Sequence, residues 1–512
     1  SVSCGLVVLM LDTLLQGFAL ILNWASLAAI VVGLLAGIVV GALPGLSATM
    51  AMALVSPFTF FMPPEIGIPF LLSLFKSAIY AGSIPAITIN TPGTAAAAAT
   101  SLDGYVLARQ GQARKALELS LVASVIADLG GTIVLILLAG WLASVALSFG
   151  PPEFALLYAM ALLTITSVSG RHAAKALLSA ALGLLIACIG LDPMSGAQRF
   201  TFGSTDLLGG ISLIPVLIGL FAMSEVFHQA EQALQRQRAV AISIAPDAQG
   251  LRFGELRKVL RTIARSTGIG VGVGVLPGIG AEISTWLAYG SAKRASRQPE
   301  QFGKGSHEGL AAAEAGNNAA CPACLIPLTV FGIPGDTVTA VMLGAFIAQG
   351  LTPGPLLFVN DAPLVYSLFA SLVISNVLLL VVAYFGIRVF SRITEIPPTV
   401  LYPVVAALCL AGSFAVNSSA SDVVLTIVAG MVGYLMLKLR MPTPPLVIAM
   451  LVAPGLENAL RQSLTLSGGS LSIFYTRPVA LTLLAIIAIM IGTLIWQQAR
   501  SISALSQGVN NS

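Results

Sequence analysis

The sequence predicts an all-α polytopic membrane protein made of two inverted repeats with broken helices and re-entrant Pro-Gly tips. Composition is the first observation that predicts it. Of 512 residues, 57% are hydrophobic and only 9% are charged, and the mean hydropathy is +0.94, whereas soluble domains carry about 25% charged residues. The formal net charge of +4 is small for this length and says little about partners.

Long apolar runs are the second observation. A spanning helix needs about 20 apolar residues. Such runs lie near 26–43, 116–148, 154–168, 173–191, 207–227, 364–389, 399–413, 422–437 and 478–497. Several of them are short, broken or fused, so we expect about ten to twelve crossings.

A sequence motif that occurs twice is the third observation. Ile84-Pro85 is followed by Asn90-Thr91-Pro92-Gly93-Thr94, and Ile326-Pro327 by Gly332-Ile333-Pro334-Gly335-Asp336. Each copy comes after a Leu-Pro-Gly break, at 43–45 and at 276–278. We therefore divide the chain into a first repeat (1–228), a polar cytoplasmic linker (229–250), a second repeat (251–455) and a C-terminal membrane helix and tail (456–512).

The placement of basic residues predicts that the repeats are inverted in the membrane. The first tip leads into a basic loop with Arg109, Arg114 and Lys115, while the second leads into a loop with Asp361 and no Lys or Arg. Cytoplasmic loops are the ones enriched in Lys and Arg. The apolar segment 267–290 lies between two basic stretches, so it either enters and returns or is an irregular element packed inside protein.

Paired breaks at matching places in two halves indicate the binding site of a secondary transporter. Pro removes a backbone donor and Gly adopts conformations closed to other residues, so freed amides and carbonyls can meet a ligand. Half-helix N-termini suit an anion, and freed carbonyls suit Na⁺. The predicted substrate-binding residues are Asn90, Thr91, Pro92, Gly93, Thr94, Asn317, Asn318, Pro334, Gly335, Asp336 and Thr337. The predicted Na⁺-binding residues are Gly45, Ser47, Asn90, Gly278, Gly280, Asn317 and Asp336.

Two other motifs have simpler interpretations. Glycines between Gly268 and Gly280 imitate a nucleotide loop, but no strand precedes them and no Lys-Ser/Thr follows, which disfavours an ATP-driven pump. Cys321-Pro322-Ala323-Cys324 has redox-motif spacing without polar or basic neighbours to lower a thiol pKa. We interpret these cysteines as helix-packing residues.

Several segments carry a resemblance to a known family: Tyr80–Ile87, the first tip, Asp103-Gly104-Tyr105, Ala288-Tyr289-Gly290, Phe302-Gly303-Lys304-Gly305, Glu314, Asn317-Asn318-Ala319 and Gly350–Pro355. Over residues 15–460 or so, the chain resembles the large membrane subunit of tripartite tricarboxylate transporters, the TctA family.

The resemblance implies a multi-pass subunit of the bacterial inner membrane that is a transporter and not an enzyme. It implies import of a di- or tricarboxylate such as citrate by symport with Na⁺ or H⁺, without a cofactor. The implied partners are a small four-helix membrane subunit and a periplasmic solute-binding protein. Similarity of the tips to those of other sodium-coupled carboxylate carriers implies an elevator-like motion. Which carboxylate and which ion are carried stays open.

Two charged residues depart from the expected pattern. Asp336 stands where the family commonly has a small neutral residue, so it either binds the coupling cation or a proton, or points to water or a basic partner. Lys76 lies in an apolar arm and either attracts substrate, pairs with Asp336 or snorkels to an interface, and we favour snorkelling.

Two other classes of function are weighed against a transporter. An intramembrane protease or thiol oxidoreductase would have only the Cys pair as a nucleophile, and no H-E-x-x-H motif occurs. An ion channel would not need two matched tips.

Overall fold

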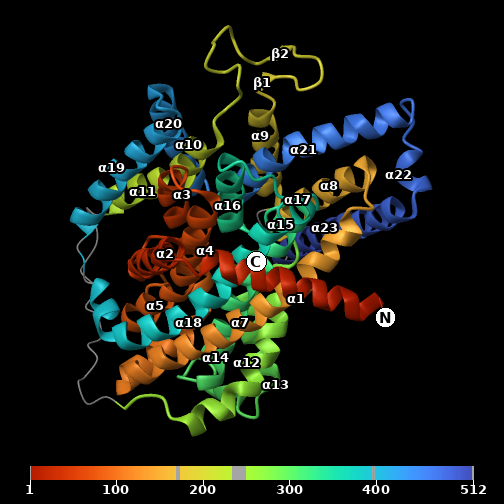
Figure 1. Cartoon of the computed structure of the whole chain (residues 1–512). Coiled ribbons are helices and arrows are strands. Elements are labelled where there is room, and N and C mark those ends of the chain that lie inside the picture. The colour runs from red at the N-terminus through yellow and green to blue at the C-terminus, as the bar shows by residue number, and fades with distance from the viewer. Residues whose placement is uncertain (1, 169–172, 233–248, 395, 397, 510–512) are drawn as a thin grey trace. The chain divides into compact units, whose positions relative to one another are not determined.

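The computed structural model describes residues 2–168, 173–232, 249–394, 396 and 398–509. The chain forms two compact units, Ser1–Ala143 with Ile214–Tyr434, and Ser144–Leu213 with Leu435–Ser512. Apart from one short two-stranded hairpin, the regular structure of the described residues is helical, which confirms the predicted all-α class (Figure 1). Most of the predicted linker, residues 233–248, lies outside the described residues.

The first unit begins with the elements of the predicted first repeat. These are α1 (Val2–Ile21), α2 (Trp24–Ala42), α3 (Ala48–Thr59), α4 (Pro64–Ala81), α5 (Ser83–Ile89), a 3-10 turn η1 (Ala95–Ala97), α6 (Ala98–Leu107), a π-turn η2 (Ala108–Gln112) and α7 (Ala113–Ala146). Later come α10 (Leu213–Leu217), a π-turn η4 (Ile218–Met223) and α11 (Ser224–Gln232).

The same unit contains the corresponding elements of the second repeat. They are α12 (Phe253–Gly274), α13 (Gly280–Ala295), a 3-10 turn η5 (Pro299–Gln301), α14 (His307–Ala323), α15 (Leu325–Phe331), α16 (Thr337–Ala348), α17 (Leu357–Asn360) and α18 (Ala362–Ile393). Two further helices, α19 (Pro398–Asn417) and α20 (Ala420–Lys438), follow. The predicted repeat boundaries and the inversion remain predictions.

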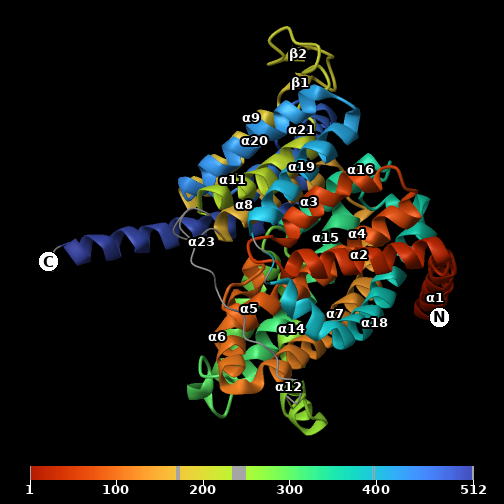
Figure 2. The same ribbon diagram turned by 90° about the vertical axis from the view of Figure 1, so that its left-hand side faces the viewer.

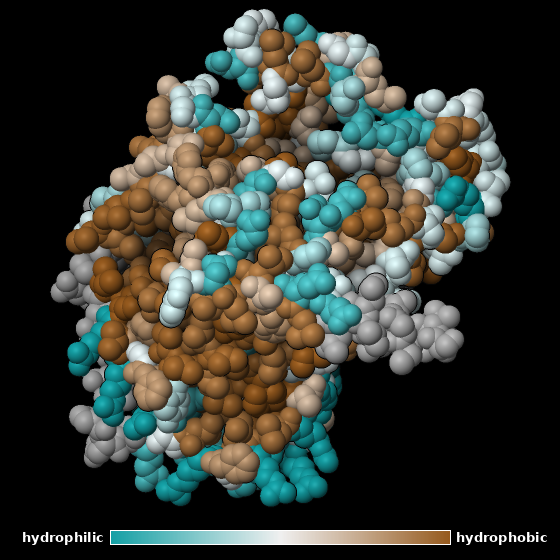
Figure 3. All heavy atoms as spheres, viewed as in Figure 1, coloured by the Kyte–Doolittle hydropathy of each residue, from teal (hydrophilic) through white to brown (hydrophobic). Residues whose placement is uncertain are grey.

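Seven helical stretches among the described residues are long and apolar enough to cross a membrane. They are Trp24–Ala42, Pro64–Ile89, Ala95–Ala146, Leu213–Gln232, Ala362–Ile393, Thr399–Asn417 and Ala420–Lys438. Large apolar side chains such as Trp24, Phe385 and Val389 are exposed on these helices, as expected for surfaces that face lipid. Figure 3 shows the broad apolar face, with hydrophilic residues gathered at its lower end.

The arm formed by α4 and α5 differs from the other spans because its apolar window is completely buried. It packs on α2, α3, α14 and α18. Irregular backbone at membrane depth is tolerated only where protein shields it from lipid. The burial of this arm therefore explains how it can hold the break at Gly82 and the turn at residues 90–94.

The segment 267–290 is a helical hairpin that folds back on itself, the geometry expected of a segment that enters and returns. Helices α12 and α13 pack against each other and against α14, and the chain reverses at Leu276-Pro277-Gly278 (Figures 1 and 2). Both bases of this hairpin lie beside the start of a neighbouring helix, because Glu255 pairs with Lys115 of α7 and Ser296 donates to Glu308 of α14. The two basic stretches therefore lie at one end, which removes the conflict with the positive-inside rule.

The second unit contains α8 (Pro151–Val168), α9 (Ala173–Ala187), α21 (Pro444–Leu466), α22 (Ile473–Thr476) and α23 (Pro478–Val509). Strand β1 (Gly190–Leu191) pairs antiparallel with β2 (Gln198–Arg199) after α9. Helix α21 packs on α8 and α9, and α23 packs on α8.

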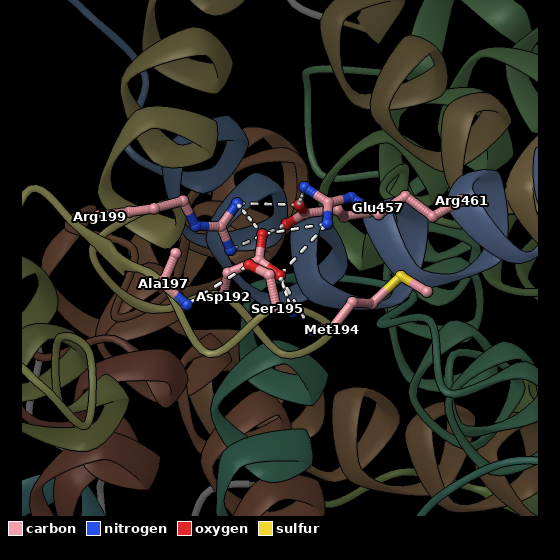
Figure 4. A network of polar contacts seen from close by, with 7 residues as sticks. All are labelled: Asp192, Met194, Ser195, Ala197, Arg199, Glu457 and Arg461. Atoms are coloured by element: carbon pink, nitrogen blue, oxygen red, sulfur yellow. Dashed lines mark hydrogen bonds and ion pairs between the residues drawn. The ribbon is translucent and has the colours of Figure 1, made fainter.

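A charged cluster fixes the β1–β2 hairpin to α21 (Figure 4). Asp192 accepts hydrogen bonds from the amides of Ser195 (2.8 Å) and Met194 (2.9 Å) and pairs with Arg461 at 3.0 Å. Arg199 and Arg461 both pair with Glu457. The two backbone amides and then Arg461 hold the pKa of the Asp192 carboxyl well below its usual range.

Candidate functional site

Both predicted tips are turns between a short helix and the next helix, and they share the same local geometry. Helix α5 ends at Asn90 with φ 54°, and α15 ends at Gly332 with φ 67°. The left-handed conformation is open to Gly and tolerated by Asn. In each tip one amide returns to the carbonyl of the arm proline, from Thr91 to Pro85 at 3.2 Å and from Ile333 to Pro327 at 3.1 Å.

Each tip glycine is packed against backbone. The Gly93 amide donates to the Gly82 carbonyl (3.0 Å), and a Cβ at Gly93 would overlap the carbonyl oxygen of Gly41. In the second tip the Gly335 carbonyl accepts from the Gly278 amide (2.8 Å), and a Cβ at Gly335 would meet Cys324. The first tip therefore lies against the end of α2, just before the first Leu-Pro-Gly turn. The second tip lies against the second Leu-Pro-Gly turn itself.

The two halves also meet each other close to the tips. Ala281 at the start of α13 packs with Ala96, just after the first tip, and with Ala320 of α14. The preceding residue, Gly280, lies against Asp336 of the second tip, where an added Cβ would stand 2.8 Å from the Asp336 Cβ. The start of α13 thus brings the surroundings of both tips together.

A reciprocal contact joins the start of α3 to the second tip. The hydroxyls of Thr49 and Thr337 are 2.9 Å apart. The Ser47 hydroxyl accepts from the Met50 amide and so caps α3. Gly45, with φ +90°, lies close to Gln229 and Tyr402. The first Leu-Pro-Gly turn is therefore held by α11 and α19, while α3 reaches the second tip.

Asn317 is the most unusual polar side chain near the tips. It lies in α14 three residues before Ala320, its exposed fraction is 0%, and neither its amide nitrogen nor its amide oxygen has a hydrogen-bond partner. A buried polar group without a partner costs about 1–3 kcal/mol. Such a group is a reasonable place for a ligand to bind.

Asn318, which was predicted together with Asn317, points elsewhere. Its amide nitrogen donates to the Ser124 hydroxyl (2.8 Å) and to the Glu314 carbonyl (3.0 Å). The adjacent asparagines therefore differ: Asn318 is engaged with α7 and its own helix, and only Asn317 has an unused amide.

The residues of the first tip are graded in exposure. Asn90 is exposed, Thr91 and Pro92 are half-buried, and Gly93 and Thr94 are buried. The Thr94 hydroxyl has no hydrogen-bond partner and lies over Gly82. Thr94 precedes η1 without capping it through its side chain.

Asp336 caps a helix. Its Oδ1 accepts from the Thr339 amide (2.8 Å) and from the Thr339 hydroxyl (2.7 Å), while its own amide donates to that hydroxyl (2.8 Å). This reciprocal box begins α16. This contact differs from the alternative of water or a basic partner, while the binding of a cation or a proton by Asp336 stays a prediction. Pro334 and Gly335 before it are buried.

The prediction that Lys76 snorkels to an interface is wrong. Its exposed fraction is 2%, and its Nζ pairs with Asp128 at 2.9 Å and donates to the Leu372 carbonyl at 2.7 Å. Asn376 lies beside the pair and, with its amide oriented to donate, reaches Asp128 at 3.1 Å. Because α4 is enclosed by protein, Lys76 finds its counter-charge on α7 rather than in water, and that partner is not Asp336.

Cys321 and Cys324 are both buried, which is consistent with the interpretation that they are packing residues. Cys321 is 1% exposed and Cys324 0%, and both are free thiols. Cys324 lies at the break between α14 and α15 and is the residue against which Gly335 packs.

Sequence reasoning missed a buried carboxyl as a candidate site residue. Glu314 was noted only as part of a family resemblance, yet it is 0% exposed and accepts hydroxyl hydrogen bonds from three other helices. The sequence contained a signal for it, namely an acidic residue in an otherwise apolar stretch. Such residues are rarely without function in membrane proteins.

Comparisons with known proteins identify a family and two relatives of this chain. A family model described as the tripartite tricarboxylate transporter TctA family matches residues 27–448. An uncharacterized 52.8 kDa protein in the TAR-I ttuC' 3' region of Agrobacterium vitis is 35% identical over 477 residues, which cover 93% of this chain and 94% of the relative. An uncharacterized protein in the TAR-II ttuC' 3' region of the same organism is 35% identical over 214 residues, 42% of this chain and 88% of the relative.

No solved structure matches the chain significantly. The family match spans all elements from α2 into α21, including both tips and both Leu-Pro-Gly turns. With that coverage, the chain is a multi-pass membrane protein and belongs to the tripartite tricarboxylate transporter TctA family.

Proposed function

We propose that the chain is the large membrane subunit of a secondary transporter that imports a di- or tricarboxylate, driven by a Na⁺ or H⁺ gradient. In this proposal a periplasmic solute-binding protein delivers the carboxylate and a small four-helix membrane subunit completes the complex in the bacterial inner membrane. Membership of a transporter family supports transport rather than catalysis.

The observation that carries the proposal is the unpaired, buried amide of Asn317, three residues before Ala320 of α14, which packs with Ala96 after the first tip and with Ala281 at the start of α13. A carboxylate oxygen would accept from the Asn317 amide nitrogen, and a bound cation or hydroxyl would satisfy its amide oxygen. Hydrogen bonds to a charged group contribute about 1.5–3 kcal/mol. Binding of the anion would thus supply the hydrogen bond that the Asn317 amide nitrogen lacks.

The two tips are unequal, and this inequality favours the first tip for the anion. The start of α16 is already capped by a carboxylate, Asp336, whereas neither η1 nor α6, the helix that follows it directly, has a side-chain cap. Uncapped helix N-termini carry free amides and partial positive charge. Thr94, with its buried unpartnered hydroxyl, stands at that uncapped start.

The coupling cation is not assigned to two of the predicted ligands. The Ser47 hydroxyl and the Asp336 carboxylate cap α3 and α16. In this proposal the carbonyl oxygens of Gly45, Asn90, Gly278 and Gly280 near the breaks are the ligands for Na⁺, with Asn317 as the buried side chain.

Two reciprocal contacts support inverted halves. Gln110, just after the first tip's helix, donates to the Lys304 carbonyl in the turn before α14 (3.2 Å). The equivalent residue of the second half, Gln349, donates to the carbonyl of Thr59, the last residue of α3, just before the turn that leads to α4 (3.3 Å). The glycines after both glutamines have the same conformation, with φ +81° at Gly111 and +82° at Gly350. Such an exchange is what a two-fold relation would produce, and elevator-like movement of the tips is part of the proposal.

Uptake by proteoliposomes tests the function. Vesicles with this chain and the small subunit would receive the binding protein and a panel of labelled carboxylates, with and without a Na⁺ or pH gradient. We expect uptake that needs both the binding protein and a gradient. Uptake that needs neither would contradict the proposal.

Asn317→Ala tests the site itself. Loss of a hydrogen bond to a carboxylate should weaken apparent affinity by about ten- to a hundredfold, equivalent to about 1.5–3 kcal/mol. The control is Asn360→Ala, because Asn360 is an exposed asparagine at the end of α17. Equal affinity in both variants would remove Asn317 from the site.

A further inference from the structure

Glu314 is enclosed by neutral donors from three other helices. Its Oε1 accepts from the hydroxyls of Ser83 (2.6 Å) and Thr100 (2.5 Å), and its Oε2 accepts from Ser124 (2.9 Å). These residues belong to α5, α6 and α7, and Glu314 itself is completely buried in α14. The carboxyl group therefore ties both arms of the first tip, α5 and α6, to the second half of the chain.

The other fully buried acids of this unit have their charges compensated. Asp103 accepts from the amides of Gly303, Gly305 and Ser306 and from the Tyr289 hydroxyl, so it anchors the loop before α14. Asp128 pairs with Lys76. Among the described residues, Glu314 has hydroxyl partners only, with neither a backbone amide nor a cation at its carboxyl group.

The helices that supply the hydroxyl partners of Glu314, together with α4, hold no charged group that is free to neutralise it. Lys76 is the only cation on α4 and is engaged by Asp128, and Arg114 and Lys115 of α7 pair with Glu118 and Glu255. Helix α5 has no titratable side chain. The remaining titratable groups on α4, α6, α7 and α14 are Glu65, Tyr80, Asp103, Tyr105, Glu118, Asp128, His307, Glu308 and Cys321. None of these is a cation in the buried core. Helices α12 and α13 also pack on α14, and their titratable groups are Glu255, Arg257, Lys258, Arg261, Arg265, Glu282, Tyr289, Lys293 and Arg294; none of these forms an ion pair with Glu314.

An isolated carboxylate in such a place is unfavourable by several kcal/mol. A positive charge must therefore accompany Glu314 whenever its shell of hydroxyls is closed. The hydroxyl oxygens stand 2.5–2.9 Å from the carboxyl oxygens, which is the separation of a hydrogen bond. A proton on the carboxyl group keeps that separation, and one of the hydroxyls can rotate to accept it.

We propose that Glu314 is the site of the coupling cation and that this cation is a proton, bound while α5 and α6 close on α14 and released when they part. The inference rests on the proposed function, because coupling requires that the chain transports a carboxylate. The reaction is a simple protonation: the carboxylate takes H⁺ from water on one side and returns it to water on the other. Glu314 lies three residues before Asn317, so proton and substrate would occupy successive turns of one helix.

Infrared difference spectroscopy on the purified full chain tests the protonation without transport. A protonated carboxyl shows a C=O band that an ionised one lacks. We expect this band at neutral pH in the wild-type chain and its loss in Glu314→Gln. The matched control is Glu118→Gln, which should leave the band unchanged because Glu118 pairs with Arg114 and accepts from the Leu251 amide. A wild-type spectrum identical to that of Glu314→Gln would overturn the proposal.

Transport by the complete complex in proteoliposomes tests the coupling. With one proton per carboxylate and the membrane potential clamped, one pH unit sustains about tenfold accumulation, since a unit equals about 1.36 kcal/mol. Glu314→Gln, which imitates the protonated state, should keep substrate exchange at the wild-type rate and show no accumulation. Glu118→Gln should accumulate normally. If Glu314→Gln does not fold, Glu314→Asp takes its place, with a shifted band and retained accumulation expected.

The outcomes separate the two proposals. Wild-type complex that moves no carboxylate contradicts the proposed function, while the infrared band still decides the state of Glu314. Accumulation by Glu314→Gln equal to the wild type overturns the inference while the function stands. Wild-type accumulation that follows Na⁺ and ignores pH also overturns it.

Discussion

Thr94 and Asp336 occupy the same position in the two tips, directly after the Pro-Gly pair, and do different things. Asp336 closes a capping box with Thr339, whereas Thr94 leaves its hydroxyl unpartnered. A carboxylate that caps a helix uses its charge on the first amides of that helix. The residue that looked like an ion ligand in the sequence therefore has a structural task, and the neutral threonine is the one with an unused group.

We expect that replacing Asp336 separates its capping role from any role in ion binding. Asp336→Ala should lower the free energy of unfolding by about 1 kcal/mol because the cap is lost, while Asp336→Ser should change it little because Ser also caps well. Chemical denaturation in mixed micelles measures the first effect. If Asp336→Ser altered the ion dependence of uptake, Asp336 would be a cation ligand after all.

The buried pair of Lys76 and Asp128 should respond to single and double replacement in opposite ways. Lys76→Met leaves Asp128 as an uncompensated buried charge, so we expect a loss of about 3–5 kcal/mol in the free energy of unfolding. Lys76→Met combined with Asp128→Leu should recover most of that loss. Denaturation curves of the three proteins provide the measurement.

Another lysine–carboxylate pair serves as the control for that cycle. Lys115 and Glu255 are 2.8 Å apart, but their side chains are 13% and 26% exposed. Partly exposed pairs contribute about 1 kcal/mol or less. Lys115→Met should therefore cost far less than Lys76→Met, and equal costs would contradict the buried-pair account.

At the scale of elements, the broken arms depend on backbone contacts that only glycine allows. The amide of Gly93 bonds the carbonyl of Gly82, and the Gly335 carbonyl bonds the amide of Gly278. The arms are thus closed by main-chain groups, and side chains add specificity afterwards. This explains why Pro and Gly are the same in both copies of the repeated sequence motif while the residues beside them differ between halves.

Gly93→Ala should abolish the closed first tip. Its new methyl group would overlap the carbonyl oxygen of Gly41, and backbone on both sides leaves no flexible atom to yield. We expect a severe loss of uptake with substrate binding weakened. Gly272→Ala is the control, because a Cβ there meets nothing within 4 Å, and Ala favours a helix by about 1 kcal/mol over Gly. Normal uptake by Gly93→Ala would show that transport does not need the closed first tip.

The β1–β2 hairpin of the second unit should loosen in acid. The pKa of Asp192 is lowered in the folded chain by the amides of Ser195 and Met194 and by Arg461. A carboxyl with a lowered folded pKa stabilises the structure above its unfolded pKa, about 3.9, and this contribution fades as pH falls below that value. Hydrogen-exchange protection of these amides should decrease from pH 5 toward pH 3, after correction for intrinsic rates.

The same experiment on Asp192→Asn provides its control. An asparagine does not titrate in this range, so its protection should be lower at pH 5 and nearly independent of pH. A wild-type hairpin with constant protection would contradict the role of the Asp192 charge.

At the scale of the whole molecule, local patterns predicted more of the fold than of the site. Composition, apolar runs and the repeated Pro-Gly motif predicted the helical class, the broken arms and the tips. The partners of Lys76, Asn318 and Glu314 were beyond those patterns, because they lie on helices 50 to 300 residues away in the chain. Adjacent residues such as Asn317 and Asn318 differ only in the direction that the helix gives each side chain.

Inverted halves predict opposite accessibility of two equivalent regions. Lys304→Cys places a thiol in the basic turn before α14, and Asn360→Cys places one at the end of α17, after the second tip. By the positive-inside rule, an impermeant thiol reagent should label the first only from the cytoplasmic side and the second only from the periplasmic side. The background is a variant without the five native cysteines. Labelling of both from one side would contradict the inversion.

The complete enclosure of the α4–α5 arm has a consequence for how the protein is made. This arm contains Lys76, Ser77, Ser83 and Pro85, residues that are poorly accommodated by lipid. One of its enclosing helices, α14, is synthesised more than 200 residues later. The ribosome thus delivers the arm long before its final surroundings exist. We expect the nascent arm to wait beside the insertion machinery or the small subunit, and to reach its place only once the second half has emerged.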